Sequence, residues 1–174
     1  MVKHILLTGK PRSGKTTLLM RIVNEIKSSC GGFYTEEILK ENERIGFRIK
    51  TIDGKEGILA EKGKKSKFMV GKYGVVLEEL ERIGVRAIEK AIKDKKIIVI
   101  DEIGKMELFS NAFRDVVLKA FSSGKRVIGT IHIQNSRFLN EIKQRNDVCL
   151  FEVNLSNHNE ILDRISDIMD IYHA

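Results

Sequence analysis

The chain has 174 residues, of which 42% are apolar and 32% charged, and these values fit a single domain over residues 1–174 with a buried core of its own. Its apolar runs, such as residues 97–100, are too short to cross a bilayer and the N-terminus lacks a signal-peptide pattern, so we expect a cytoplasmic protein with no membrane partner. The net charge of +7 allows a nucleic-acid partner, but lysine and glutamate are interspersed as on a heat-adapted surface, so nucleic acid is not the favoured partner.

A glycine-rich loop follows the first apolar run of the chain. Its sequence, GKPRSGKT, matches the pattern G-x-x-x-x-G-K-T at every fixed position. Glycine permits backbone angles that other residues avoid, so the amide groups of such a loop turn inward around a phosphate, toward the positive end of the helix that follows. We expect the loop to bind a nucleoside triphosphate, with Lys15 at the β- and γ-phosphates and Thr16 as a ligand of Mg²⁺. The predicted contacts are Gly9, Lys10, Pro11, Arg12, Ser13, Gly14, Lys15, Thr16 and Thr17.

One helix and an antiparallel insert come next. Apolar residues between Leu18 and Ile26 recur at helical spacing, which predicts a helix that packs on the sheet. Three strands separated by turn-forming residues are then predicted over residues 32–38, 44–52 and 56–60. The lysine-rich segment 61–67 is interpreted as a solvated loop, with contact to an anionic partner as the alternative.

Helices and strands alternate through the rest of the chain. Apolar stripes indicate helices, and short apolar runs indicate strands. The predicted elements are a helix over residues 76–92, a strand over 97–100, a helix over 113–121, a strand over 126–131, a helix over 137–145, a strand over 148–153 and a helix over 159–172. This alternation predicts an α/β fold, a mostly parallel sheet with helices on both faces and the antiparallel hairpin insert.

The strand over residues 97–100 ends in two acidic residues. Asp101 emerges at the carboxyl end of this strand, where open α/β sheets bind ligands, and we assign it with Thr16 to the Mg²⁺ site. Glu102 points toward the γ-phosphate, and we predict that it is the catalytic base that deprotonates water rather than a surface or capping glutamate. Lys15 is the second predicted catalytic residue. Further residues expected at the nucleotide are Val99, Ile100, Ile103, Gly104 and Lys105.

Three segments resemble a known family. Residues 101–108 (DEIGKMEL), 32–36 (GFYTE) and 70–75 (VGKYGV) are similar to the small P-loop nucleoside-triphosphatases whose human member is called cancer-related nucleoside triphosphatase. The resemblance spans nearly the whole chain. It implies a RecA-like or AAA-like P-loop fold, a protein that acts as a monomer, Mg²⁺-dependent release of inorganic phosphate and acceptance of several bases. By position it also implies supporting roles for Lys105 and Glu107.

The predicted activity is hydrolysis of nucleoside triphosphates. We expect broad base tolerance, including ATP and GTP, because the chain lacks the N-K-x-D segment that binds guanine. Turnover is expected to be slow, because no arginine is recognisable as a finger, Arg12 being the nearest exception. A small-molecule kinase remains the first alternative and would need an acceptor pocket. A nucleic-acid-stimulated ATPase is the second.

Some residues keep two interpretations. Thr130 and His132 end a strand and either sense the γ-phosphate or, for His132, serve as a structural histidine. Residues 71–74 either approach the nucleotide or turn the chain. Cys30 and Cys149 show neither C-x-x-C pairing nor metal-ligand spacing, so we expect two reduced, buried thiols.

Overall fold

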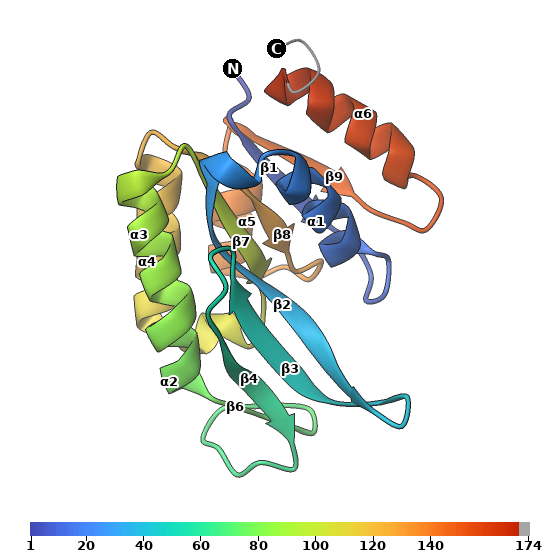
Figure 1. The fold of residues 1–174 in the computed structure, drawn as a ribbon, viewed down its shortest axis with the longest axis vertical. Helices are drawn as coiled ribbons and strands as arrows, with labels where there is room; N and C mark the ends of the chain where they lie inside the picture. Colours follow the sequence, from blue (N-terminus) through green and yellow to red (C-terminus); the bar gives the residue numbers. More distant parts are fainter. Residues whose placement is uncertain (171–174) are drawn as a thin grey trace.

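A computed structural model describes residues 1–170, and within them nine strands form one sheet. The strands lie in the order β5-β6-β4-β3-β2-β7-β8-β1-β9. Their bounds are β1 His4–Thr8, β2 Cys30–Lys40, β3 Glu43–Thr51, β4 Glu56–Lys62, β5 Met69–Val70, β6 Tyr73–Val75, β7 Ile97–Ile103, β8 Arg126–Ile131 and β9 Val148–Glu152. Neighbours are parallel from β2 through β7, β8 and β1 to β9, and antiparallel from β2 to β5. This mixed sheet confirms the predicted α/β fold (Figure 1).

Helices cover both faces of the parallel strands (Figure 1). α1 and α6 pack on one face with Ile5 and Leu7 of β1, whereas α3, α4 and α5 pack on the other face with Leu6. Successive side chains of a strand point to opposite faces, so β1 contributes to both halves of the core. The helix bounds are α1 Lys15–Glu25, η1 Lys27–Ser29, α2 Leu77–Glu79, η2 Leu80–Val85, α3 Arg86–Asp94, η3 Glu107–Phe109, α4 Asn111–Ser122, α5 Arg137–Lys143 and α6 His158–Met169.

β2 changes its partner along its length. It pairs with β7 as far as Phe33, opposite Ile100, and from Phe33 onward it pairs with β3. β2 and β3 therefore continue past the parallel strands as a long hairpin that projects from the body of the molecule (Figure 1). We call residues 33–75 the insert. β5 and β6 were not predicted, because two or three residues are too few to show an alternating pattern, and residues 71–72 turn the chain between them.

Two helices differ from their predicted form. α2 continues into η2, a wide π-helical turn, before α3 begins, and a periodicity of 3.6 residues does not anticipate such a turn. The last helix ends at Met169 instead of residue 172, because Asp170 takes a left-handed conformation with φ of 52°. Residues 171 and 172 of the predicted helix lie outside the described residues.

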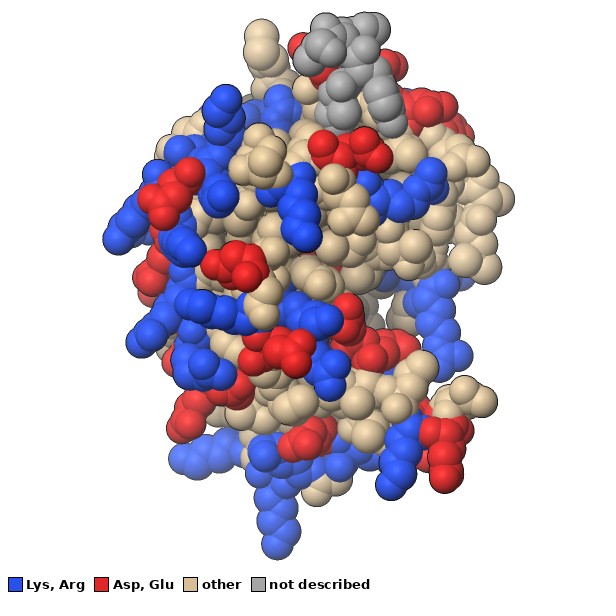
Figure 2. Space-filling view, in the orientation of Figure 1, with Lys and Arg blue, Asp and Glu red and all other residues tan. Residues whose placement is uncertain are grey.

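Cys30 and Cys149 are both free thiols, as predicted, but only Cys30 is buried; Cys149 is half-buried on β9, the strand at the edge of the sheet. Burial raises the pKa of Cys30 to about 11, so this thiol stays protonated. Basic and acidic side chains are interspersed on the face that Figure 2 shows, as the sequence indicated. No helix within residues 1–170 has the length and apolar character needed to cross a membrane.

Candidate nucleotide site

The glycine-rich loop connects β1 to α1 at the carboxyl end of the parallel strands. Two of its glycines are required by their surroundings. Gly9 has φ of 151° and a Cβ there would lie 2.5 Å from the carbonyl oxygen of Val153. Gly14 has φ of 87°, and a Cβ there would collide with the ring of His158. The loop can hold this shape only with glycine at both positions.

Lys15 and Thr16 occupy the first turn of α1. The ammonium of Lys15 donates to the carbonyl oxygens of Gly9, at 2.9 Å, and Lys10, at 3.1 Å, so it lies across the loop. The Ser13 hydroxyl is buried and has no hydrogen-bond partner within the described residues. A buried polar atom without a partner is costly, and a phosphate oxygen at the loop would supply one.

Asp101 joins four elements of the fold. Its carboxylate accepts hydrogen bonds from Thr16 Oγ1 of α1, at 3.1 and 3.2 Å, from Thr130 Oγ1 of β8, at 2.6 Å, and from Thr35 N of β2, at 3.2 Å. Burial raises the pKa of Asp101, while these three hydrogen bonds oppose the rise. The Thr130 hydroxyl therefore orients Asp101, which corrects the expectation that it senses the γ-phosphate.

The Thr16 and Asp101 oxygens fit a Mg²⁺ site. Adjacent ligands of an octahedral ion with bonds near 2.1 Å lie about 3 Å apart, as these oxygens do. No group of three or more His, Cys, Asp or Glu side chains in the described part of the chain is arranged to hold a metal. Two protein ligands suffice for Mg²⁺ at a phosphate site, where phosphate oxygens and waters complete the coordination.

Two glutamates meet beside Asp101. A Cβ on Gly104 would lie 3.1 Å from Glu102 Cδ and 3.2 Å from Glu107 Oε2, so both carboxyl groups converge on this glycine. Burial and the charge of Asp101 raise the pKa of Glu102 to about 7, against the opposing charge of Lys15. Glu107 is 4% exposed, and burial followed by the charge of Glu102 raises its pKa well above the ordinary value. The pair therefore carries a proton near neutral pH.

The loop and the insert face each other across a cavity of about 750 Å³, which we call the phosphate cavity. Loop residues through Thr17 line one side, and Thr35 to Glu37 of β2 line the other. Arg44 and Phe47 of β3 and, from the parallel strands and the segments after them, Glu102, Lys105 and His132 also line it. In Figure 2 the surface is hollowed at the right, between the upper body and the insert below it. A triphosphate held by the loop would thus meet Glu102 inside the cavity.

His132 lies in this cavity as a neutral donor. Its Nδ1 accepts a hydrogen bond from Gln134 N at 3.1 Å, which places the proton of the neutral ring on Nε2. Burial, followed by Lys105, Lys143 and Lys15, lowers its pKa. Of the two interpretations of His132, its position favours a donor directed at phosphate.

Some predicted site residues do not reach the cavity. Val99, Ile100 and Ile103 are fully buried in the core, and none of them lines the phosphate cavity. They were predicted among the nucleotide contacts, and instead they anchor the strand that presents Asp101. Gly104 acts through the space it leaves for the two glutamates. Lys10 is exposed, and its carbonyl oxygen accepts a hydrogen bond from the Lys15 ammonium.

Three contributors were missed by sequence analysis. Thr35 donates its amide to Asp101, Phe47 of β3 lines the cavity, and His158 of α6 donates from Nε2 to the Ser13 carbonyl at 2.8 Å. Thr35 was quoted only as part of a family-like segment. Nothing in the local sequence around Phe47 or His158 marks either residue, because both come to the site through the fold.

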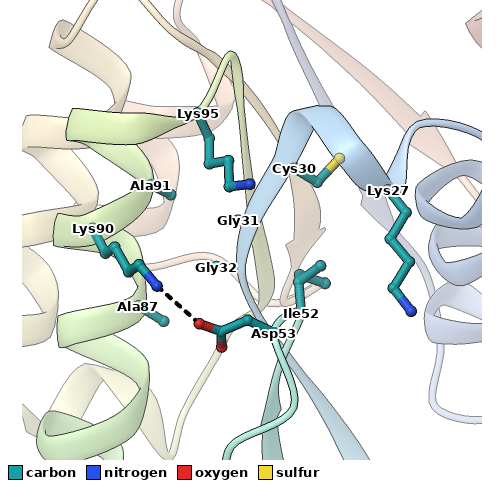
Figure 3. Close-up of a pocket in the computed structure, with 10 residues that line it drawn as sticks. All are labelled: Lys27, Cys30, Gly31, Gly32, Ile52, Asp53, Ala87, Lys90, Ala91 and Lys95. Atoms are coloured by element: carbon teal, nitrogen blue, oxygen red, sulfur yellow. Dashed lines mark hydrogen bonds and ion pairs between the residues drawn. The ribbon is translucent and has the colours of Figure 1, made fainter.

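A smaller cavity of about 250 Å³ lies at the other end of the sheet, between α3 and the start of β2 (Figure 3). Cys30, Gly31 and Gly32 form part of its wall. One of its lysines, Lys90, is paired with Asp53 at 3.1 Å. This cavity shares no lining residue with the phosphate cavity and takes no part in the candidate site.

A family model, curated proteins and solved structures each match almost the whole chain. A model of the NTPase family matches residues 4–166. The nucleoside-triphosphatase THEP1 of Thermotoga sp. (strain RQ2) is 50% identical over 165 residues, which cover 95% of this chain and 94% of that protein. The crystal structure of THEP1 from the hyperthermophile Aquifex aeolicus superimposes with a TM-score of 0.87 at 38% identity, covering 96% of this chain and 99% of that one. The solution structure of a human cancer-related nucleoside triphosphatase superimposes with a TM-score of 0.82 at 35% identity, covering 98% of this chain and 99% of that one.

Proposed function

The chain belongs to the NTPase family and is a nucleoside-triphosphatase, and from this premise we propose that it cuts the β–γ bond of nucleoside triphosphates in a Mg²⁺-dependent reaction. The observation that carries the proposal is the contact of Thr16 with Asp101 at the foot of the loop, beside Lys15 and Glu102. The family membership also confirms the resemblance that residues 101–108 indicated.

Each residue has a distinct task in the proposed reaction. Lys15 and the loop amides bind the β- and γ-phosphates, and Thr16 and Asp101 would hold Mg²⁺, which neutralises charge on the phosphates when bound. Glu102 accepts a proton from water, the water oxygen attacks the γ-phosphorus, and the bond to the bridging oxygen breaks. The nucleoside diphosphate leaves with that oxygen. His132 donates a hydrogen bond to the transferred group.

We infer broad base tolerance and slow turnover from what the site offers. ATP and GTP are both proposed substrates, because the sequence lacks the N-K-x-D segment that selects guanine. Arg12 and Arg44 line the phosphate cavity, but Arg44 is bound to Glu37 and to Tyr73. An arginine that reaches the transferring phosphoryl group raises rates by about a thousandfold or more. Arg12, exposed on the loop, is the remaining candidate in the cavity lining, and we propose that it does not act as such a finger and that turnover stays below about 10 per second; faster turnover that Arg12→Ala slows sharply would give it this role.

A phosphate-release assay tests the proposal. We expect release from ATP, GTP, CTP and UTP, abolished when EDTA removes Mg²⁺. Glu102→Gln should lower turnover roughly a hundredfold while the affinity for Mg²⁺-ATP stays within a few-fold, because only the base is lost. The exposed Glu78 of α2 supplies the matched control, Glu78→Gln, which should behave as wild type.

Three results would contradict parts of this proposal. Release that persists in EDTA would remove the metal from the reaction. A preference above roughly a thousandfold for one base would require a dedicated base pocket. Near-normal hydrolysis by Glu102→Gln would transfer the role of the base to His132 or Glu107.

A further inference from the structure

The side chain of His158 reaches the phosphate-binding loop from α6, 145 positions further along the chain than Ser13. His158 is the first residue of α6, and its Nε2 lies 2.8 Å from the carbonyl oxygen of Ser13. A carbonyl oxygen can only accept, so Nε2 carries a proton and donates this hydrogen bond. The ring packs against Gly14, where any Cβ would collide with it.

His158 lies behind the loop, outside the phosphate cavity. Gly14, Lys15 and Thr16 line that cavity, whereas neither Ser13 nor His158 does. A nucleotide held by the loop would therefore contact the cavity side of the loop, and His158 contacts the other side. Any effect of His158 on the nucleotide must pass through the backbone of the loop.

The hydrogen bond from His158 fixes the orientation of one peptide unit. The Ser13 carbonyl and the Gly14 N–H belong to the same trans peptide, and in such a peptide these two groups point in opposite directions. Because the carbonyl is directed at His158, the N–H is directed away from α6, toward the phosphate cavity. Within residues 1–170 this N–H donates to no backbone acceptor, so it is free to donate to a phosphate oxygen.

Without this hydrogen bond the peptide has a second orientation open to it. Gly14 has φ of 87°, and a glycine lacks the Cβ that restricts rotation of the neighbouring peptide. Rotation would direct the Ser13 carbonyl into the cavity in place of the Gly14 N–H, and its partial negative charge would repel phosphate. The Ser13 hydroxyl supplies no other anchor, because it has no hydrogen-bond partner within the described residues.

We propose that His158 is a positioning residue for phosphate binding, whose hydrogen bond to Ser13 holds the Gly14 N–H toward the phosphate cavity before a nucleotide arrives. This inference rests on the proposed binding of the β- and γ-phosphates by the loop, and it adds a residue that acts through the loop. α6 and α1 share one half of the core, so the helix that carries His158 is fixed to the helix that follows the loop (Figure 1).

Such preorganisation has a defined kinetic signature. If only about a tenth of the empty molecules hold the N–H inward, the apparent affinity for phosphate falls about tenfold. A phosphate that has bound holds the N–H itself, so the reaction step is unaffected. Loss of the His158 hydrogen bond should therefore raise KM about tenfold and leave kcat within about threefold of wild type.

Three variants separate the hydrogen bond from packing. His158→Phe keeps an aromatic ring against Gly14 and removes the donor. His158→Gln replaces the ring by an amide group that can donate to the same carbonyl oxygen. Asn159→Ala is the matched control, because Asn159 accepts a hydrogen bond from Arg21 of α1 at 3.4 Å, a contact between the two helices that does not involve the loop.

The full chain is titrated in the presence of Mg²⁺ with the β,γ-imido analogue of ATP and with inorganic tripolyphosphate, which has the phosphates and no nucleoside. In calorimetry His158→Phe should weaken both ligands about tenfold. His158→Gln and Asn159→Ala should stay within about threefold of wild type. Urea unfolding verifies that each variant is folded under the conditions of the titration.

Nuclear magnetic resonance reports the orientation of the peptide directly. In the empty protein the Gly14 amide should give one signal in wild type and in His158→Gln. In His158→Phe this signal should broaden or split, and addition of tripolyphosphate should restore a single signal. A loss of stability alone would not produce this ligand-dependent change.

Five outcomes would overturn the inference: His158→Phe binds tripolyphosphate as tightly as wild type, His158→Gln is as weak as His158→Phe, Asn159→Ala is equally weak, kcat falls as much as kcat/KM, or the Gly14 signal is the same in every variant. The third outcome would assign the effect to the docking of α6 as a whole. If wild type binds neither ligand, phosphate binding by the loop fails and the inference fails with it. If wild type binds tripolyphosphate without hydrolysing ATP, only the proposed hydrolysis fails.

Discussion

Replacing Thr130 by valine should make Asp101 a weaker Mg²⁺ ligand while leaving its carboxylate in place. Valine has nearly the shape of threonine, so Thr130→Val exchanges one buried hydroxyl for a methyl group. The lost hydrogen bond is the shortest of those to Asp101, at 2.6 Å, and both residues are 1% exposed. Hydrogen bonds to charged groups contribute about 1.5 to 3 kcal/mol, and Asp101 would keep only those from Thr16 and Thr35.

We expect the free energy of unfolding of Thr130→Val to fall by about 1.5 to 3 kcal/mol at pH 7. Burial already raises the pKa of Asp101, and the Thr130 hydrogen bond is the first of the effects that lower it. Its loss raises that pKa further, which destabilises the ionised folded state. The difference from wild type should therefore be largest at neutral and higher pH, and should shrink as pH falls and Asp101 binds a proton in both proteins.

Urea unfolding and phosphate release against Mg²⁺ concentration measure the two consequences. A less ionised and less oriented Asp101 should require more Mg²⁺ for half-maximal activity. Thr130→Ser keeps the hydroxyl and loses only a methyl group, so it should lose some stability but retain the wild-type Mg²⁺ requirement. If Thr130→Val stays within about 0.5 kcal/mol of wild type and has the same Mg²⁺ curve, the hydrogen bond does not govern Asp101.

Further predictions concern Glu102, Lys15 and Gly14. Because the pKa of Glu102 is raised to about 7 and a base must be ionised, turnover should rise about tenfold per pH unit below 7 and level off above it; a flat profile from pH 5 to 8 would exclude Glu102 as the base. Lys15→Ala should weaken ATP binding itself in calorimetry, unlike Glu102→Gln, and equal affinities would contradict the assigned roles. Gly14→Ala should lower stability by about 1 to 2 kcal/mol through its left-handed backbone alone, and His158→Ala should relieve only the additional clash, as urea unfolding of the double variant would show.

The predictable parts of the site are those formed by residues that are adjacent in the sequence. The glycine-rich loop and the pair Asp101 and Glu102 combine fixed residue types with a strand end, so local sequence places them at one edge of the sheet. Thr35 reaches Asp101 from 66 positions away, and that contact depends on how β2 pairs with β7. Gly104 indicates a tight turn in the sequence, but the convergence of Glu102 and Glu107 on this glycine depends on how the chain folds back after that turn.

Sequence analysis predicted the strands of the insert but not that the insert forms one wall of the phosphate cavity. Alternating patterns and turn residues locate β2, β3 and β4, yet they do not say which way a hairpin bends or what it faces. Arg44 illustrates the limit. In the sequence it is one scattered arginine, and only the folded insert places it between Phe47 and Tyr73 at the edge of a cavity. The contribution of the insert to the cavity wall therefore becomes visible only in three dimensions.

β2 couples the insert to the phosphate chemistry. The same strand donates the amide of Thr35 to Asp101 and carries Glu37, which binds Arg44 at 3.0 Å on the neighbouring strand. The position of β2 in the insert and the orientation of Asp101 are therefore linked through a single strand.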